Sequence, residues 1–168
     1  DGAGVVAARN TAAALAEGKF LMPLDADDAL PPKSLETLTD AWPGDGIVYG
    51  DTLIFGQDFQ RRYNSRKYHF ANLLEGLIMP VGSLHLKSDW EKIDGWHPDM
   101  EDGLEDWEYW IRMGENGVCG HYIPQVTYHY RRRKSGRYLN LKSTPDGYKK
   151  AYQTMRDIHK DVYNGRFP

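Results

Sequence analysis

The pattern of apolar and polar positions switches between helical and strand periods along the chain, which predicts an α/β protein. Small and apolar residues recur at helical spacing up to Gly18, and a short apolar run follows that glycine. Polar and basic residues dominate 57–68 and 131–147, where loops are expected. The predicted helices cover 5–17, 33–42, 70–77, 104–115 and 148–163, with one helical turn at 90–93, and the predicted strands cover 19–24, 47–55, 83–86 and 119–130.

Length, composition and charge narrow the class of protein. The 168 residues are enough for one domain with its own core, and 12% aromatic residues are too many for a disordered chain. The single cysteine, Cys119, excludes an internal disulfide framework and a cysteine-cluster metal site. No apolar stretch reaches the roughly 18 residues that cross a bilayer. A net charge of −3 gives no indication of a nucleic-acid partner.

The most informative feature is an acidic cluster, Asp25-Ala26-Asp27-Asp28, directly after the predicted strand 19–24. In α/β sheets ligands bind beyond the carboxyl ends of strands, and carboxylates placed there can hold a hard divalent ion. A solvated turn leading into a helix N-terminus explains the same residues without chemistry. A phosphatase with an Asp-x-Asp motif is a rival interpretation, although the Gly-Thr that usually follows that motif is absent.

A second acidic cluster opens the predicted helix 104–115. Asp102 and Glu105 have the spacing of a capping pair, which explains both residues structurally. Asp106 is not explained in this way and shares a helix face with Trp110. A carboxylate against aromatic surface is partly desolvated, which raises its pKa and makes it a better general base.

Taken together, four ordered segments resemble the family 2 glycosyltransferases. They are 4–10 with its Ala-Arg-Asn, 16–28 with Leu-Asp-Ala-Asp-Asp, 105–112 with Glu-Asp-Trp-Glu, and Tyr128-His129-Tyr130-Arg131. The resemblance spans roughly residues 1–135. It implies the GT-A fold of nucleotide-diphospho-sugar transferases, a Rossmann-like mixed sheet flanked by helices.

The resemblance also implies an activity and roles for individual residues. The activity is an inverting, metal-dependent transfer of a sugar from a nucleotide-diphospho-sugar to an acceptor hydroxyl. Asp25 is expected to contact the nucleotide-sugar and, with Asp27, to bind Mg²⁺ or Mn²⁺, with Asp28 as a weaker candidate behind them. Arg9 is expected beside these carboxylates or the sugar. Asp106 is expected to be the catalytic base.

The segment around Tyr128-His129-Tyr130-Arg131 has two further candidates. His129 matches a position where some relatives place a metal or diphosphate contact, and an inert, hydrogen-bonded histidine on a strand is the alternative. Arg131 begins a basic run, 131–137, that resembles the loop closing over the diphosphate in this family, and guanidinium suits phosphate oxygens. A solvated loop is the plain alternative, and a nucleic-acid role is disfavoured by the rest of the chain.

The region 60–100 is expected to line the acceptor side, where aromatic faces can stack on sugar rings. Trp42 and Trp90 are expected to pack in the core instead. The acceptor contacts expected from the sequence are Trp96, Trp110 and Glu105, and the further candidates in the region are Tyr68, His69, His85 and His97.

The resemblance describes one catalytic-domain fragment over 1–168. Its expected parts are a metal-motif part at 1–56, an acceptor-side part at 57–135, and a C-terminal loop and helix at 136–168. The strands that should precede the Ala-Arg-Asn helix are missing, so the fragment alone is expected to bind nucleotide weakly and to be poorly active. The expected donor is a UDP-sugar, and the expected acceptor is a glycan or lipid-linked molecule used in cell-envelope polysaccharide synthesis.

A cytoplasmic location, with peripheral association at the inner face of the membrane, fits that role. Two other functions stay open at this point. One is a noncatalytic carbohydrate- or partner-binding remnant of the same fold. The other is a metal-dependent phosphatase or nucleotidyltransferase. Turnover of a nucleotide-sugar separates both from a glycosyltransferase.

Overall fold

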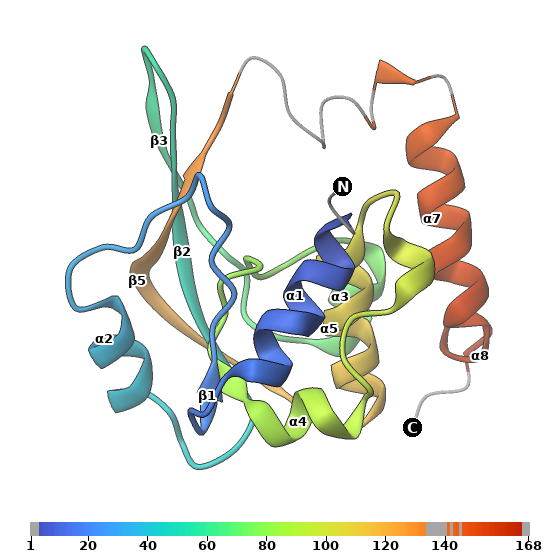
Figure 1. Cartoon of the computed structure of the whole chain (residues 1–168), viewed down its shortest axis with the longest axis horizontal. Helices are drawn as coiled ribbons and strands as arrows, with labels where there is room; N and C mark the ends of the chain where they lie inside the picture. Colours follow the sequence, from blue (N-terminus) through green and yellow to red (C-terminus); the bar gives the residue numbers. More distant parts are fainter. Residues whose placement is uncertain (1–3, 134–140, 142, 145, 166–168) are drawn as a thin grey trace.

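The computed structural model describes residues 4–133, 141, 143, 144 and 146–165 (Figure 1). The strands are β1 (Phe20–Leu21), β2 (Ile47–Phe55), β3 (Gln60–Tyr63), β4 (His85–Leu86) and β5 (Gly120–Arg131). The helices are α1 (Gly4–Leu15), α2 (Ser34–Asp40), α3 (Phe70–Glu75), α4 (Lys87–Lys92), η1 (Pro98–Met100, a 3-10 turn), α5 (Glu105–Glu115), α7 (Gly147–Ile158) and α8 (Lys160–Tyr163).

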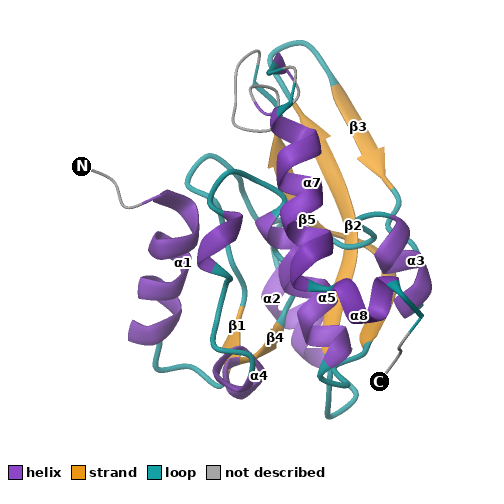
Figure 2. Ribbon diagram, turned by 90° about the vertical axis from the view of Figure 1, so that its right-hand side faces the viewer, coloured by secondary structure: helices purple, strands orange, loops and turns teal. Residues whose placement is uncertain are grey.

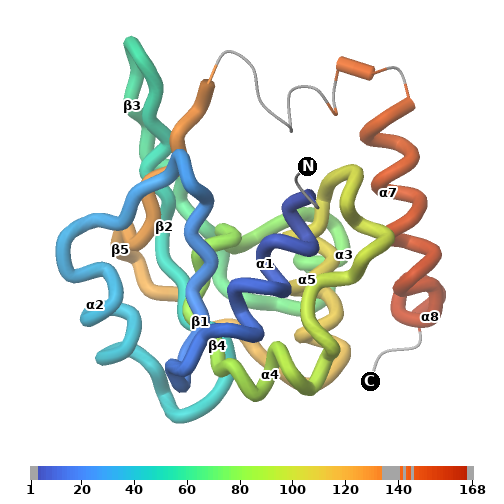
Figure 3. The backbone as a smooth tube through the Cα atoms, in the orientation of Figure 1, coloured from blue at the N-terminus to red at the C-terminus, as the bar shows by residue number. Residues whose placement is uncertain are grey.

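A mixed sheet forms one side of the molecule. The larger group of helices, which includes α1, α3, α5 and α7, forms the other side of the molecule (Figures 1 and 2). The strand order is β3-β2-β5, with β2 antiparallel to β3 and parallel to β5. The short strands β1 and β4 form an antiparallel pair, and a bridge between Val48 and Leu84 connects this pair to β2 (Figure 3). The mixed α/β architecture expected from the sequence is therefore confirmed.

Two strand predictions need correction. The strand expected at 19–24 is only Phe20–Leu21, because Pro23 has no N–H to donate to a ladder. The loop expected at 57–68 contains β3, whose four residues are all exposed. An exposed edge strand carries no apolar alternation, so the pattern that reveals buried strands is missing from it.

Helix α5 is the centre of the core. Its residues Trp107–Ile111 and Met113 are buried, and α3 packs directly against it. The helix predicted at 148–163 is divided at His159 into α7 and α8, and Tyr152 of α7 lies against Trp107 of α5 with ring centroids 5.7 Å apart. The core residues of α5 are Trp107, Tyr109, Trp110, Ile111 and Met113.

The predicted capping pair at the start of α5 is wrong. Leu104, at φ 60°, is the N-cap residue and forms no side-chain capping hydrogen bond. Gly103, at φ 141°, and Leu104 turn the chain sharply before the helix. Asp102 is directed to α7 instead, where its carboxylate lies 3.1 Å from Lys150 Nζ.

Glu101 has a capping role that the sequence did not indicate. Its carboxylate accepts hydrogen bonds of 2.6 and 3.1 Å from the backbone N–H groups of Val5 and Val6 in the first turn of α1. These N–H groups have no partner within the helix, and a carboxylate there is favoured by the helix dipole. The contact joins α1 to the segment that leads into α5.

Candidate functional site

A cavity of about 650 Å³ lies between the sheet and the helices α1 and α5. The sheet contributes one face of its three strands, and α1 and α5 contribute charged side chains from the other side. The segments 75–77 and 79–81, after α3, form a further, mostly apolar part of the wall. The site residues predicted from the sequence that line this cavity are Arg9, Asp25, Asp27, Glu105, Asp106 and Arg131.

Arg9 joins the two acidic clusters. Its guanidinium lies 2.7 Å from an Asp25 oxygen and 3.0 Å from a Glu105 oxygen. The Arg9 side chain is only 10% exposed, so these ion pairs are shielded from solvent. The carboxylates that follow β1 and those that begin α5 are separated by more than 75 residues in the chain, and Arg9 holds them at one site.

Asp106 has the electrostatics of a general base. Burial, with the negative charge of Glu105 as the second cause, raises the pKa of Asp106 to about 6, although Arg9 and a backbone hydrogen bond oppose the shift. That hydrogen bond comes from the N–H of Trp107, which donates to Asp106 Oδ1 over 2.8 Å. A carboxylate with this pKa is mostly ionised at neutral pH and accepts a proton more readily than an ordinary aspartate.

The Asp25–Asp28 loop is fixed to β5 by its last residue. The Tyr128 hydroxyl donates to Asp28 Oδ2 over 2.7 Å, and the Arg131 N–H donates to Asp28 Oδ1 over 2.7 Å. Burial raises the pKa of Asp28. Asp28 is absent from the cavity wall, so it acts as a brace for the loop, which leaves Asp25 and Asp27 to face the cavity.

Asp25 and Asp27 are suited to a divalent ion that also contacts a ligand. Among the described residues, no group of three or more His, Cys, Asp or Glu side chains is placed to hold a metal. Mg²⁺ commonly uses only one or two carboxylates together with substrate phosphates. Both side chains are about one-third exposed and line the cavity, so their oxygens fit that arrangement.

His129 does not join these carboxylates. Successive residues of a strand point to opposite faces, and it is Tyr128 and Tyr130 that line the cavity. The His129 ring lies instead on the other face, 6.2 Å from the ring of Phe55. Its backbone pairs with Ala29. The structure therefore corrects the prediction of His129 as a metal ligand in favour of the structural alternative.

Basic side chains lie beside Asp27. Arg131 Nε donates to the Asp27 carbonyl over 2.7 Å, and Arg133 Nε lies 3.0 Å from Asp27 Oδ2. The Arg131 guanidinium also covers the Phe55 ring at 4.4 Å. The rest of the predicted basic loop, 134–137, lies outside the described residues.

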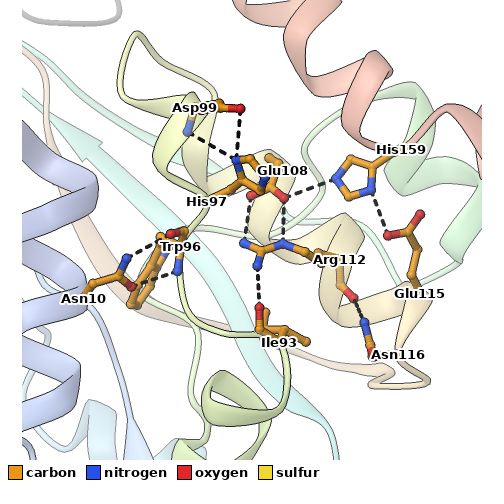
Figure 4. Close-up of polar contacts among 10 residues, drawn as sticks. All are labelled: Asn10, Ile93, Trp96, His97, Asp99, Glu108, Arg112, Glu115, Asn116 and His159. Atoms are coloured by element: carbon orange, nitrogen blue, oxygen red, sulfur yellow. Dashed lines mark hydrogen bonds and ion pairs between the residues drawn. The ribbon is translucent and has the colours of Figure 1, made fainter.

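The two tryptophans predicted to contact the acceptor lie in the core. Trp96 is 2% exposed and stacks on Tyr109 at 4.3 Å, and Trp110 is 1% exposed. Asn10 fixes the backbone of Trp96 with hydrogen bonds of 2.8 and 2.9 Å (Figure 4). Neither indole presents a face to the cavity, so the acceptor role predicted for both is corrected to packing.

Two of the further candidates in the region 60–100 have structural contacts. His85 is fully buried, burial lowers its pKa to about 4, and its Nε2 lies 2.8 Å from the Tyr109 hydroxyl. His97 caps η1 through the N–H of Asp99. Tyr68, His69, His85 and His97 are all absent from the cavity wall.

The cavity wall has four tyrosines to which no role was assigned from the sequence, namely Tyr63, Tyr128, Tyr130 and, at the start of α7, Tyr148. Tyr128 and Tyr130 belong to the Tyr-x-Tyr of β5, and Tyr63 ends β3. Tyr63 is 43% exposed and Tyr130 is 38% exposed. The alternation within β5 is a signal that indicates one shared face for Tyr128 and Tyr130, whereas the exposed strand β3 gives none for Tyr63.

Residues 1–94 match the family described as glycosyl transferase family 2, and the chain belongs to this family. A search of curated proteins found no match. Solved structures of S. aureus TarS share the fold, although their sequences are only 12–14% identical to this one. TarS 1–349 matches with a TM-score of 0.63 over 91% of this chain and 44% of that chain. TarS 1–349 in complex with UDP-GlcNAc matches with a TM-score of 0.67 over 90% of this chain and 46% of that chain.

This chain therefore spans less than half the length of those TarS structures. In the described part of the chain, no helix is long and apolar enough to cross a membrane.

Proposed function

We propose that this protein transfers a sugar from a nucleotide-diphospho-sugar to a hydroxyl group of an acceptor, with inversion at the anomeric carbon and with a divalent metal. The observation that carries the proposal is that Asp25, Asp27 and Asp106 line one cavity in a chain of glycosyl transferase family 2. A UDP-sugar is the proposed donor, because a structural relative, TarS, was crystallised with UDP-GlcNAc. A glycan or lipid-linked acceptor on the cytoplasmic side of the membrane completes the proposal.

Asp106 performs the proton transfer in this proposal. Its Oδ1 accepts the Trp107 N–H, so Oδ2 is the oxygen available to the acceptor hydroxyl. Oδ2 takes the hydroxyl proton as the acceptor oxygen forms its bond to the anomeric carbon and the bond from that carbon to the diphosphate breaks. A single displacement of this kind inverts the anomeric configuration, because attack and departure occur on opposite faces.

The donor is held by residues of the Asp25–Asp28 loop and by the basic residues beside it. Asp27 and Asp25 would hold Mg²⁺ or Mn²⁺, which when bound offsets the negative charge of the diphosphate. Arg9 keeps Asp25 in place through its 2.7 Å ion pair. Arg131 and Arg133, beside Asp27, supply further positive charge for phosphate oxygens.

Asp27→Asn is expected to abolish metal-dependent binding of UDP by the full-length protein. The substitution removes the negative charge and leaves the size of the side chain unchanged, and hard cations need anionic oxygen. Calorimetry with UDP and Mn²⁺ measures the effect, and Asp58→Asn, an exposed aspartate between β2 and β3, is the matched control. Equal affinity in wild type and Asp27→Asn would remove Asp27 from the metal site.

Arg131→Ala is expected to weaken binding of UDP by about 10-fold while uridine binding changes little. A charge-assisted hydrogen bond to phosphate is typically worth about 1.5 kcal/mol or more, and uridine has no phosphate to lose it. Competition binding with the two ligands measures the difference, and Arg61→Ala on exposed β3 is the control. If UDP and uridine weakened equally, Arg131 would be supporting the fold of the Asp25–Asp28 loop.

A further inference from the structure

Two exposed tyrosines stand on the cavity face of the sheet, on either side of β2. In the strand register, Tyr63 of β3 pairs with Thr52, and Tyr130 of β5 pairs with Ile54. Residues two apart on a strand share a face, so Thr52 and Ile54 form the floor between the two rings. The outer strands β3 and β5 are two strand spacings apart, about 10 Å. The result is a shallow trough with an aromatic ring on each side.

The two rings differ in their distance from the reacting groups. Tyr130 lies near the carboxylates of both acidic clusters. Burial is the main cause of the raised pKa of its hydroxyl, and the negative charges of Asp28, Asp27, Asp25 and Asp106 raise this pKa further. The Asp25–Asp28 loop adjoins β5, because Ala29 pairs with His129, whereas Tyr63 is on β3, on the far side of β2 from that loop. Tyr130 therefore lies near the reaction centre, and Tyr63 lies further out.

Neither tyrosine has a structural task among the residues that the structure describes. In the described part of the chain, neither hydroxyl forms a hydrogen bond and neither ring stacks on another ring. Tyrosine rings left open in a cavity are typical of ligand sites, where they give a large apolar face with a polar end. The arginines of the wall, Arg131–Arg133, follow Tyr130 at the end of β5. The wall residues from β3 and 75–81, around Tyr63, include Glu75 and no lysine or arginine, so this outer part of the wall does not favour an anionic ligand.

On these grounds we propose that Tyr63 and Tyr130 form an acceptor platform that binds a neutral oligosaccharide through the faces of its sugar rings. Tyr130 contacts the sugar unit that carries the reacting hydroxyl, beside Asp106, and Tyr63 contacts a unit further along the same chain. The platform makes the acceptor a glycan, in preference to a lipid alcohol or an anionic polymer. This inference rests on the proposed function, because it assigns the acceptor end of the same cavity.

The test measures binding of neutral tetrasaccharides, namely those of maltose, cellulose and chitin type, to the full-length protein saturated with UDP and Mn²⁺. Saturation-transfer NMR and calorimetry give the dissociation constants. At least one tetrasaccharide is expected to bind saturably. Tyr63→Ala and Tyr130→Ala should each weaken it by roughly 2- to 10-fold, the scale of one aromatic stacking contact.

The control variants separate stacking from other effects. Tyr63→Phe and Tyr130→Phe keep the ring face and should retain binding within about 2-fold. Phe59→Ala removes an equally exposed ring, 45% exposed, from the same hairpin but outside the cavity, and should change nothing. UDP affinity should be equal in all variants, and since all these positions are exposed, their melting temperatures should stay close to that of the wild type.

Two results would overturn the platform. One is that no neutral tetrasaccharide binds saturably, including the case in which only an anionic oligogalacturonate or a lipid alcohol binds. The other is that a tetrasaccharide binds and neither alanine variant weakens it. Turnover of UDP-GlcNAc and other UDP-sugars by the wild type is measured in parallel. If the wild type turns over a UDP-sugar but binds no oligosaccharide, the platform alone is rejected. If the wild type turns over no UDP-sugar, the proposed function is rejected.

Discussion

Asp106→Asn is expected to lower the rate of sugar transfer by roughly 10²–10⁴-fold, the usual scale for loss of a general base. The affinity for UDP should be unchanged, because the donor is held by Asp25, Asp27 and the arginines beside them. The melting temperature should also be unchanged. The Trp107 N–H donates to Asp106 Oδ1, and the amide oxygen of an asparagine can accept the same hydrogen bond.

The matched control is Asp102→Asn, which changes an exposed aspartate four residues earlier in the chain. Asp102 contacts Lys150 on the surface and is absent from the cavity wall, so its loss should leave transfer intact. A large fall in the melting temperature of Asp106→Asn, with residual activity that follows the folded fraction, would make Asp106 a structural residue. Glu105, which also lines the cavity, would then be the next candidate for the base.

The pH profile gives an independent view of the same base. The pKa of Asp106 is raised to about 6, and a base must be ionised to accept a proton. The rate of transfer should therefore increase as the pH rises through about 6 and level off above it. Arg9→Met should move this rise to higher pH, because the guanidinium of Arg9 lowers the pKa of Asp106.

Glu108→Gln is expected to destabilise the fold by about 3–5 kcal/mol, the typical cost of breaking a buried ion pair from one side. Glu108 is fully buried and its oxygens lie 2.7 Å from Arg112 Nε and 3.3 Å from His159 Nε2 (Figure 4). The substitution leaves Arg112 and His159 without that buried negative charge. For a domain of this size the melting temperature should fall by roughly 6–20 °C.

Thermal unfolding followed by circular dichroism measures this effect. Glu36→Gln is the control, because Glu36 is exposed on α2 and its ion pair with Lys33 is a surface contact. A Glu108→Gln protein that melts within two degrees or so of the wild type would show that the network contributes little to stability. Glu115, which lies 2.8 Å from His159 Nδ1, would then be the main partner of the histidine.

The same network predicts how stability depends on pH. Hydrogen bonds to Glu108 and Glu115 raise the pKa of His159 above 6.5 despite burial, so its contribution is complete below that pH and is lost as the pH rises through the raised value. The partners of Glu108 lower its pKa below 4.5 despite burial, so its contribution is lost as the pH falls through the lowered value. Stability from this pair is therefore greatest between these limits, and Glu108→Gln should flatten the alkaline decline.

The sequence predicted those parts of the site that belong to continuous motifs. Helix 104–115 and the loop Asp25–Asp28 were predicted close to where they occur, since apolar periodicity and a buried run before an acidic turn are local signals. The ion pairs of Arg9 were only loosely predicted. They depend on how α1 and α5 meet, and no local signal fixes that arrangement.

The wrong predictions have separate physical causes. The sequence does not distinguish an aromatic residue that packs in the core from one that faces a ligand. Trp96 and Trp110 were therefore predicted to contact the acceptor, although both lie in the core. His129 was misplaced because the two faces of β5 were not assigned, although the alternation of Tyr128 and Tyr130 contained that information. Asp102 has capping spacing, but a backbone turn at Gly103 directs it elsewhere.

The most direct test of the proposed function is release of UDP from UDP-GlcNAc and other UDP-sugars in the presence of Mn²⁺ and a panel of glycan and lipid-linked acceptors, measured side by side for the wild type and Asp106→Asn. The proposed function predicts that the full-length wild type releases UDP from at least one of these donors. It predicts that Asp106→Asn binds UDP equally well but releases it at least about 100-fold more slowly. Absence of UDP-sugar turnover by the wild type would reject the proposed function, and UDP release by Asp106→Asn at the wild-type rate would reject Asp106 as the base.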